Sequence, residues 1–272
     1  MNPQVDKRIY WPDDSPIAAC ATHDIDRLFD AKMRAYQILQ NIRRLKLGNA
    51  ARCLTKDPMS ISKIVELDRK LGIKSTIFLM AKEYEIAHEE VWDATDRGFE
   101  IGLHGSYESH LDKWKLAEEK VTLARKAKIR IKDIRGIRQH YLRFKEPDTW
   151  IAQRGLFLYD STYAWPDHIG YRNGKAYPFY TGYEMWEIPL AVMDVTVFNV
   201  QRIGWNQIKL LIDRVEKKGG LFTYLWHNES LTEISATRPW LKMYTKITEY
   251  LKEKKAWFGT GSEIVEWTGQ LF

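Results

Sequence analysis

Short β-rich runs alternate with amphipathic helical periods along almost the whole chain, and this alternation constrains the fold more than any other feature. The expected strands are residues 17–22, 75–80, 100–103, 134–138, 158–160, 185–190, 221–226 and 256–260. The expected helices are residues 28–47, 61–71, 88–97, 113–128, 148–154, 205–218 and 239–254. About seven β–α repeats predict a parallel sheet, and this number favours a closed barrel over an open sheet.

Length and composition agree with one barrel. A chain of 272 residues is typical of an α/β barrel. With 44% hydrophobic residues, 16 Gly and 9 Pro, the chain is globular, which excludes collagen-like repeats and disorder. We expect a single domain over residues 1–272, of the α/β class, folded as a distorted (β/α)7-8 TIM-like barrel.

Three features predict a cytoplasmic protein. No apolar run reaches the roughly 20 residues that a membrane span needs. The first residues lack the apolar stretch of a secretory signal. Cys20 and Cys53 lie in unrelated contexts without metal-type spacing, which is typical of reduced cytosolic thiols.

The basic residues are unevenly placed in a chain of net charge +6. They gather in residues 43–56 and 120–132, where they suit phosphate in nucleic acid or in anionic lipid headgroups. A solvated helix face is the simpler interpretation, and a membrane-surface role comes second. No zinc-finger, RNP-like or helix-turn-helix signature is present, so we expect no nucleic-acid partner.

Residues 164–183 interrupt the alternation with a segment rich in Gly, Pro and Tyr that has no clear period. A loop of this length in a compact domain is usually functional. Its aromatic rings suit either the apolar faces of a sugar or the packing of loops over a barrel mouth, and the sequence leaves both interpretations open.

Polar residues follow several expected strands where each apolar run ends. They are Asp24, Asp26, His104, Arg138, His140, Asp160, Asp194 and His227. The carboxyl ends of parallel strands share one face of a barrel, so these groups should converge on one mouth. Ionised Asp after an apolar strand is costly unless it binds a metal, a cation or hydrogen-bond donors. The pattern predicts a metallohydrolase site. The plainer alternative is a set of polar residues that each cap a loop. Asp160 and Asp194 either orient a site residue or cap a turn.

Ligand chemistry indicates which metal such a site would take. Imidazole with carboxylate suits zinc, iron, cobalt or nickel better than magnesium or calcium, and zinc is our first choice. A catalytic site keeps one position open and therefore needs about three protein ligands. A second carboxylate near the ion is then available as a general base.

Several of these segments resemble motifs of the polysaccharide deacetylase family, the carbohydrate esterases with a NodB-type homology domain. Thr22-His23-Asp24-Ile25-Asp26 is similar to the first motif, and Glu100-Ile101-Gly102-Leu103-His104 to the lead-in of the second. Arg138-Gln139-His140-Tyr141 stands where the family has R-x-P-Y, and Leu225-Trp226-His227 matches its closing L-x-H. The resemblance covers nearly the whole chain in motif order, is closer still to branches from surface-polysaccharide gene clusters, and implies the NodB-type barrel.

The resemblance also implies roles for individual residues. Asp24 would be the general base, with Arg138 paired to it, and His227 would be the general acid that protonates the leaving amine. Asp26 and His104 would be metal ligands. The backbone N–H of Tyr141 would help to stabilise the developing oxyanion.

The third metal ligand is where this chain departs from the family. The second motif of the family is H-x-x-x-H, but the fourth residue after His104 is Glu108, and His110 lies six residues away. His140 occupies the position where the family usually has Pro. We place His110 first from motif order, with His140 as the alternative ligand or substrate contact and Glu108 third.

The expected function is removal of an N-acetyl or other N-acyl group from an amino sugar. The alternatives are an inactive deacetylase-like protein that binds or assembles glycans, and a metal-dependent acyl transferase or deformylase. The expected partners are an amino-sugar-containing glycan, a nucleotide sugar or a lipid-linked oligosaccharide, with peripheral contact at the inner face of the membrane. The resemblance implies an O-antigen or capsule pathway, and the sequence leaves the oligomeric state open.

Overall fold

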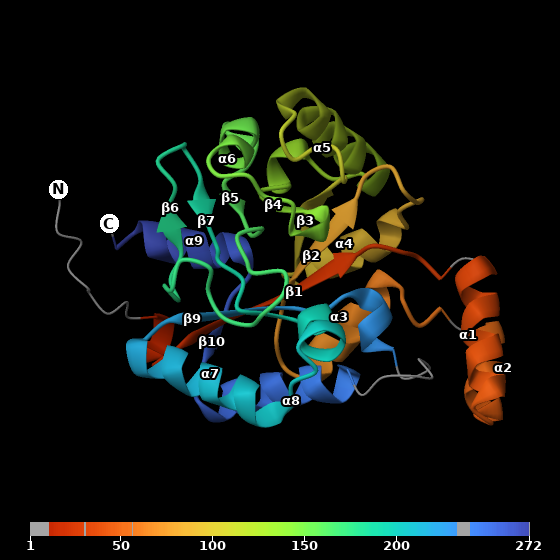
Figure 1. Cartoon of the computed structure of the whole chain (residues 1–272). Helices are drawn as coiled ribbons and strands as arrows, with labels where there is room; N and C mark the ends of the chain where they lie inside the picture. The colour runs from red at the N-terminus through yellow and green to blue at the C-terminus, as the bar shows by residue number, and fades with distance from the viewer. Residues whose placement is uncertain (1–10, 30, 56, 233–239, 272) are drawn as a thin grey trace.

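The barrel strands form in the order that the alternation predicts (Figure 1). The computed structural model describes residues 11–29, 31–55, 57–232 and 240–271. Lys56 of the basic stretch and Pro239, the expected start of the last helix, lie outside these residues. The strands are β1 (Ala18–Ile25), β2 (Thr76–Met80), β3 (Glu100–Gly105), β4 (Gly136–Gln139), β5 (Tyr159–Asp160), β6 (Phe179–Tyr180), β7 (Trp186–Glu187), β8 (Val192–Met193), β9 (Leu221–Leu225) and β10 (Trp257–Phe258).

The strands pair in the order β6-β7-β5-β4-β3-β2-β1-β9-β8, with β10 beside the start of β1. All the pairs are parallel except β6 with β7. Every residue of β1, β2 and β9 is buried, as expected for parallel strands covered on both faces. The expected α/β class is confirmed.

One short segment completes the ring of strands. The residues 186–193 pair with β5 through β7 and with β9 through β8. Between these two ladders, the Ile188 N–H donates to the Asp160 carbonyl and the Ala191 N–H to the Thr223 carbonyl, both at 2.9 Å. The ring is therefore closed by a segment that changes partner half-way, which accounts for the distortion of the barrel.

The helices that cover the ring lie close to their expected positions. They are α3 (Ile61–Lys70), α4 (His88–Asp96), α5 (Lys113–Ala127), α6 (Asp148–Gln153), α7 (Trp205–Lys218) and α8 (Trp240–Glu253). Short helical turns include one directly after β4 (His140–Leu142) and one after β8 (Thr196–Val200). None of the helices in the described residues combines the length and hydrophobicity of a membrane span.

Two parts of the helix prediction were wrong. The expected helix 28–47 is instead α1 (Ala31–Arg43), followed by a turn and α2 (Leu47–Thr55). Leu45 in this turn has a φ of 57°, and the helical period hid the break because no Gly or Pro marks it. A further helix, α9 (Gly261–Gly269), was not expected, although its capping box between Thr260 and Glu263 is a signal in the sequence.

Candidate metal centre

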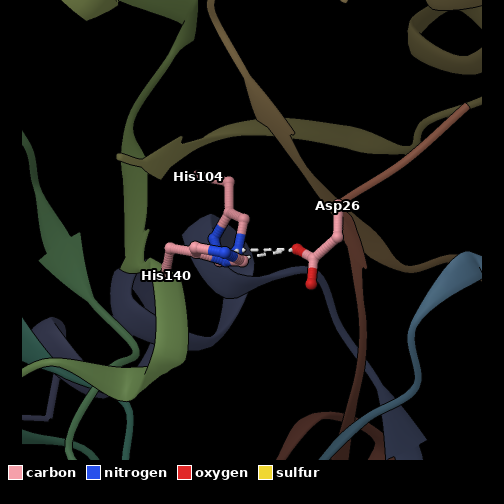
Figure 2. Close-up of side chains that lie close together, drawn as sticks. All are labelled: Asp26, His104 and His140. Atoms are coloured by element: carbon pink, nitrogen blue, oxygen red, sulfur yellow. Dashed lines mark hydrogen bonds and ion pairs between the residues drawn. The ribbon is translucent and has the colours of Figure 1, made fainter. Parts of the chain in front are cut away.

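The ends of three parallel strands of the sheet bring one carboxylate and two imidazoles together (Figure 2). Asp26 directly follows β1, and His140 directly follows β4. His104 is the second-last residue of β3. These strands run in parallel in the order β4-β3-β2-β1, so their carboxyl ends open on the same face. The ligand atoms of the three side chains all lie within 4.8 Å of one another.

The three ligand atoms have the spacing of a tetrahedral metal site. His104 Nε2 lies 3.1 Å from His140 Nδ1 and 3.1 Å from Asp26 Oδ1, and His140 Nδ1 lies 3.4 Å from the same oxygen. A zinc ion at about 2.0–2.1 Å from each ligand would hold neighbouring ligands about 3.3–3.4 Å apart. The side chains therefore already form one face of a tetrahedron.

The hydrogen bonds of the cluster leave its ligand atoms available to a cation. His104 Nδ1 lies 3.0 Å from the Arg138 carbonyl oxygen, which only accepts, so Nδ1 carries the proton and neutral His104 directs the Nε2 lone pair at the cluster. Asp26 Oδ1 is buried, and among the described residues no donor meets it with hydrogen-bond geometry. A buried carboxylate oxygen facing two imidazole nitrogens fits a divalent cation.

The pKa shifts of Asp26 and His104 also fit a cation site. Burial opposes ionisation of Asp26, but the imidazoles of His104 and His140 outweigh it and hold the pKa of this carboxyl well below its usual range. Burial also lowers the pKa of His104, but Asp24 and Asp26 outweigh burial and raise it overall. A proton therefore competes with a metal ion for the imidazole of His104.

Asp24 and Arg138 form a buried ion pair beside the cluster. Asp24 lies within β1 and Arg138 within β4, so both precede the strand ends at which the sequence placed them. The guanidinium donates to Asp24 Oδ1 at 3.0 Å, to the hydroxyls of Thr22 and Ser161 at 2.8 Å each, and to the Ser161 carbonyl at 2.8 Å. These bonds fix the guanidinium, and it directs the Asp24 carboxylate at the mouth: Asp24 Oδ2 lies 3.8 Å from His104 Nε2.

His227 faces the cluster from the other side of β1. It follows β9 after Trp226, and its Nε2 lies 3.6 Å from Asp26 Oδ2. Asp194, directly after β8, lies 2.8 Å from His227 Nδ1 and accepts the His227 backbone N–H at 2.9 Å. Burial lowers the pKa of His227, but the carboxylates, Asp194 first, outweigh burial and raise it to about 10. Asp194 therefore orients a site residue, the first of the two roles that the sequence left open.

The geometry does not place His110 in the cluster. His110 lies in the turn that leads from β3 into α5, where burial and the nearby Arg143 cation lower its pKa. It is not one of the three side chains whose ligand atoms gather, and Glu108 of the same turn pairs with Lys115 at 3.1 Å. His140, the alternative third ligand, completes the cluster in place of His110, which was the first choice. His140 directly follows β4, so it reaches the mouth without a bulge in the chain.

Two further buried groups belong to the framework. His23 points away from the mouth, with Nδ1 3.0 Å from the Trp226 carbonyl and Nε2 3.0 Å from Asp68. Asp160 does not contact the cluster: its side chain is completely buried and accepts a hydrogen bond from Thr162.

Tyr141, next to His140, has a φ of 58°, a conformation that non-glycine residues rarely adopt.

No family model matches the chain, and no curated protein matches it. Three solved structures superpose over almost their full length. A protein from Mycobacterium smegmatis described as a polysaccharide deacetylase has a TM-score of 0.62 and 16% identity, covering 95% of this chain and 92% of its own. One from Pseudomonas aeruginosa PAO1 with the same description has a TM-score of 0.63 and 18% identity, over 95% and 92%. Puue allantoinase has a TM-score of 0.65 and 16% identity, over 98% and 93%. The chain therefore has the distorted barrel fold of the polysaccharide deacetylases, as expected.

Proposed function

We propose that this protein is a metal-dependent amide hydrolase that removes an N-acyl group, acetyl first, from an amino sugar. The observation that supports it is the triangle of Asp26, His104 and His140. Asp24 lies beside the His104 corner of this triangle and His227 beside its Asp26 corner. A ligand set flanked by one carboxylate and one imidazole supplies the base and the acid that amide hydrolysis requires.

Asp26, His104 and His140 would hold the ion, which when bound supplies Lewis acidity to the site. Imidazole with carboxylate again favours zinc, with cobalt, nickel or iron as alternatives. Because a proton competes for His104, the metal affinity should rise with pH.

The flanking residues divide the proton transfers. Asp24, held in place by its ion pair with Arg138, takes the proton of the attacking water. His227 enters the reaction protonated, because Asp194 supports its charge, and it gives its proton to the departing nitrogen. The backbone N–H of Tyr141, next to the ligand His140, donates to the oxyanion. Amide hydrolysis requires both of these proton transfers: a base activates the water, and an acid protonates the amine, which is otherwise a poor leaving group.

Cations on the rim favour a substrate that carries negative charge. Arg143 lies in the loop after β4, three residues after His140, and its guanidinium lies 4.0 Å from the centre of the Tyr107 ring. Arg172, in the loop between β5 and β6, lies 4.9 Å from the centre of the Tyr163 ring. Within the described part of the chain, neither guanidinium forms an ion pair with a carboxylate. We therefore favour a phosphate-bearing amino sugar, either a nucleotide sugar or a lipid-linked oligosaccharide, in O-antigen or capsule synthesis.

Metal analysis of three purified proteins tests the proposal. The wild type should retain about one equivalent of metal. His140→Ala should lose it, whereas His110→Ala, which removes a histidine from the neighbouring turn, should retain it. The opposite pattern would make His110 the ligand. No retention by the wild type, even after incubation with zinc, cobalt or nickel, would refute the hydrolase.

Acetate release from N-acetyl amino sugars tests the reaction itself. Asp24→Asn should keep the metal but lose the base, so its acetate release should fall by about 10²–10⁴-fold. A variant that releases acetate as fast as the wild type would show that Asp24 is not the base. Comparison of free with phosphate-linked N-acetyl sugars tests the role of the rim cations.

A further inference from the structure

The hairpin of α1 and α2 has a charge unlike the rest of the chain. Residues 31–56 contain seven Lys and Arg and no Asp or Glu, whereas the net charge of all 272 residues is only +6. The positive excess of the molecule therefore lies in this one stretch. Arg43, Arg44 and Lys46 lie within four residues of one another at the tip of the hairpin, around the turn that joins its helices.

The same hairpin exposes large apolar side chains among these cations. Leu45 is 87% exposed, Leu47 65% and Leu54 66%. Tyr36, Leu39 and Ile42 are also exposed on α1. Ile42, Leu45 and Leu47 are interspersed with Arg43, Arg44 and Lys46. The tip therefore presents leucine and isoleucine side chains next to positive charge.

The spacing of the exposed residues gives each helix an apolar stripe. On α1, Ala35, Leu39 and Ile42 stand at i, i+4 and i+7, and on α2 Leu47, Ala51 and Leu54 do the same. The inner faces of the hairpin are occupied separately, because Phe29, Cys53 and Met59 form a small core of their own. The stripes are therefore not needed to hold the two helices together.

The hairpin stands at the periphery of the molecule (Figure 1), and it is inserted directly after β1. Asp26, the carboxylate of the metal centre, is five residues before the first residue of α1. The base of the hairpin therefore leaves from the carboxyl-end face of the barrel, where the mouth opens.

We propose that the α1–α2 hairpin docks on an anionic lipid bilayer, with the tip leucines in the interface and the cations on the headgroups. A face of this kind matches both parts of an anionic bilayer surface: its apolar stripes suit the acyl-chain boundary, and its Lys and Arg suit the anionic headgroups. A second copy of the chain would bring two strongly positive hairpins together. Nucleic acid would neutralise the cations but leave the leucines in water.

Vesicle flotation of the full chain tests this proposal without reference to its activity. The protein should float with vesicles of phosphatidylcholine and phosphatidylglycerol, should remain unbound with phosphatidylcholine alone, and should dissociate in high salt. Arg43→Gln/Arg44→Gln/Lys46→Gln should weaken partitioning roughly 100-fold, at one cation's contribution per residue. The matched control Arg214→Gln/Lys217→Gln/Lys218→Gln removes three exposed cations from α7 and should bind as the wild type does.

The leucines distinguish a bilayer from other polyanions. Leu45→Asp/Leu47→Asp should abolish flotation, whereas Leu210→Asp, at a 54% exposed leucine on α7, should not. Asp tolerates the positive φ of position 45, so the double variant should fold, which circular dichroism checks. Flotation unaffected by the tip variants, or absent from the wild type, would overturn the proposal. So would duplex DNA binding that is equal in the wild type and Leu45→Asp/Leu47→Asp and stronger than vesicle binding.

Discussion

Removal of the Arg138 guanidinium should destabilise the barrel more than any surface change, because Arg138 and Asp24 are both buried and their ion pair connects β4 with β1. Arg138→Met keeps an unbranched, shorter side chain and leaves the Asp24 carboxylate without its cation. It also leaves the Ser161 carbonyl without a donor, whereas the Ser161 hydroxyl keeps its bond to the Ile188 carbonyl. The perturbation therefore concerns one charge and one carbonyl group.

The expected magnitude follows from these two groups. Breaking a buried ion pair by removing one partner costs about 3–5 kcal/mol. An unsatisfied buried carbonyl adds about 1–3 kcal/mol. Arg138→Met should therefore lower the free energy of unfolding by about 4–8 kcal/mol. In Asp24→Asn/Arg138→Met the stranded charge is gone, so the double variant should be destabilised by about 3 kcal/mol less than the sum of the two single variants.

Urea unfolding in the presence of a chelator measures these differences without a contribution from bound metal. Arg138→Lys keeps the charge but loses the planar fork, so it should lie between the wild type and Arg138→Met. Should Arg138→Met fail to fold, Arg138→Lys and Asp24→Asn complete the cycle. Additive effects, within about 0.5 kcal/mol, would refute the argument that the two side chains form a coupled pair.

Two further predictions concern carboxylates beside the site. Asp194→Asn removes the charge that raises the pKa of His227, so burial should lower that pKa, and the alkaline limb of acetate release should move to lower pH; an unchanged limb would assign the acid role elsewhere. Burial raises the pKa of Asp160 to about 6, and burial with the Asp160 charge raises that of Glu187 further. Because the folded state then holds protons that the unfolded state has lost, the free energy of unfolding should fall as pH rises from about 4 through 6 and above. Asp160→Asn should show a smaller fall in urea titrations at pH 5 and pH 8; parallel curves for both proteins would contradict it.

Much of the fold could be predicted because its signals are local. Apolar runs and helical periods placed the barrel strands within a few residues, and β1, expected to end at Thr22, continues to Ile25. The extension occurs because neighbouring β2 pairs with Thr22–Ile25, which the sequence of β1 alone does not show. Pairings of two residues, such as β8, depend on tertiary contacts and left no period to detect.

The site was predicted less evenly, since it depends on which atoms meet. Strand ends identified Asp26 and His104, but the choice between His110 and His140 depended on the path of the turn after β3, which periodicity does not describe. Asp194 carried a signal, an acid directly after an apolar strand, but its contact with a residue 33 positions later could only be seen in the folded chain.

The segment 186–193 gives the barrel a seam. It holds the ring by ladders of two residue pairs on each side, whereas β1 and β9 share five. Amide hydrogens of Ile188 and Ala191 should therefore exchange with solvent earlier than those of β1. Because Asp194 ends this segment, opening of the seam would also release His227. A ligand that needs His227 in place binds only the closed ring, so its binding should slow amide exchange at the seam.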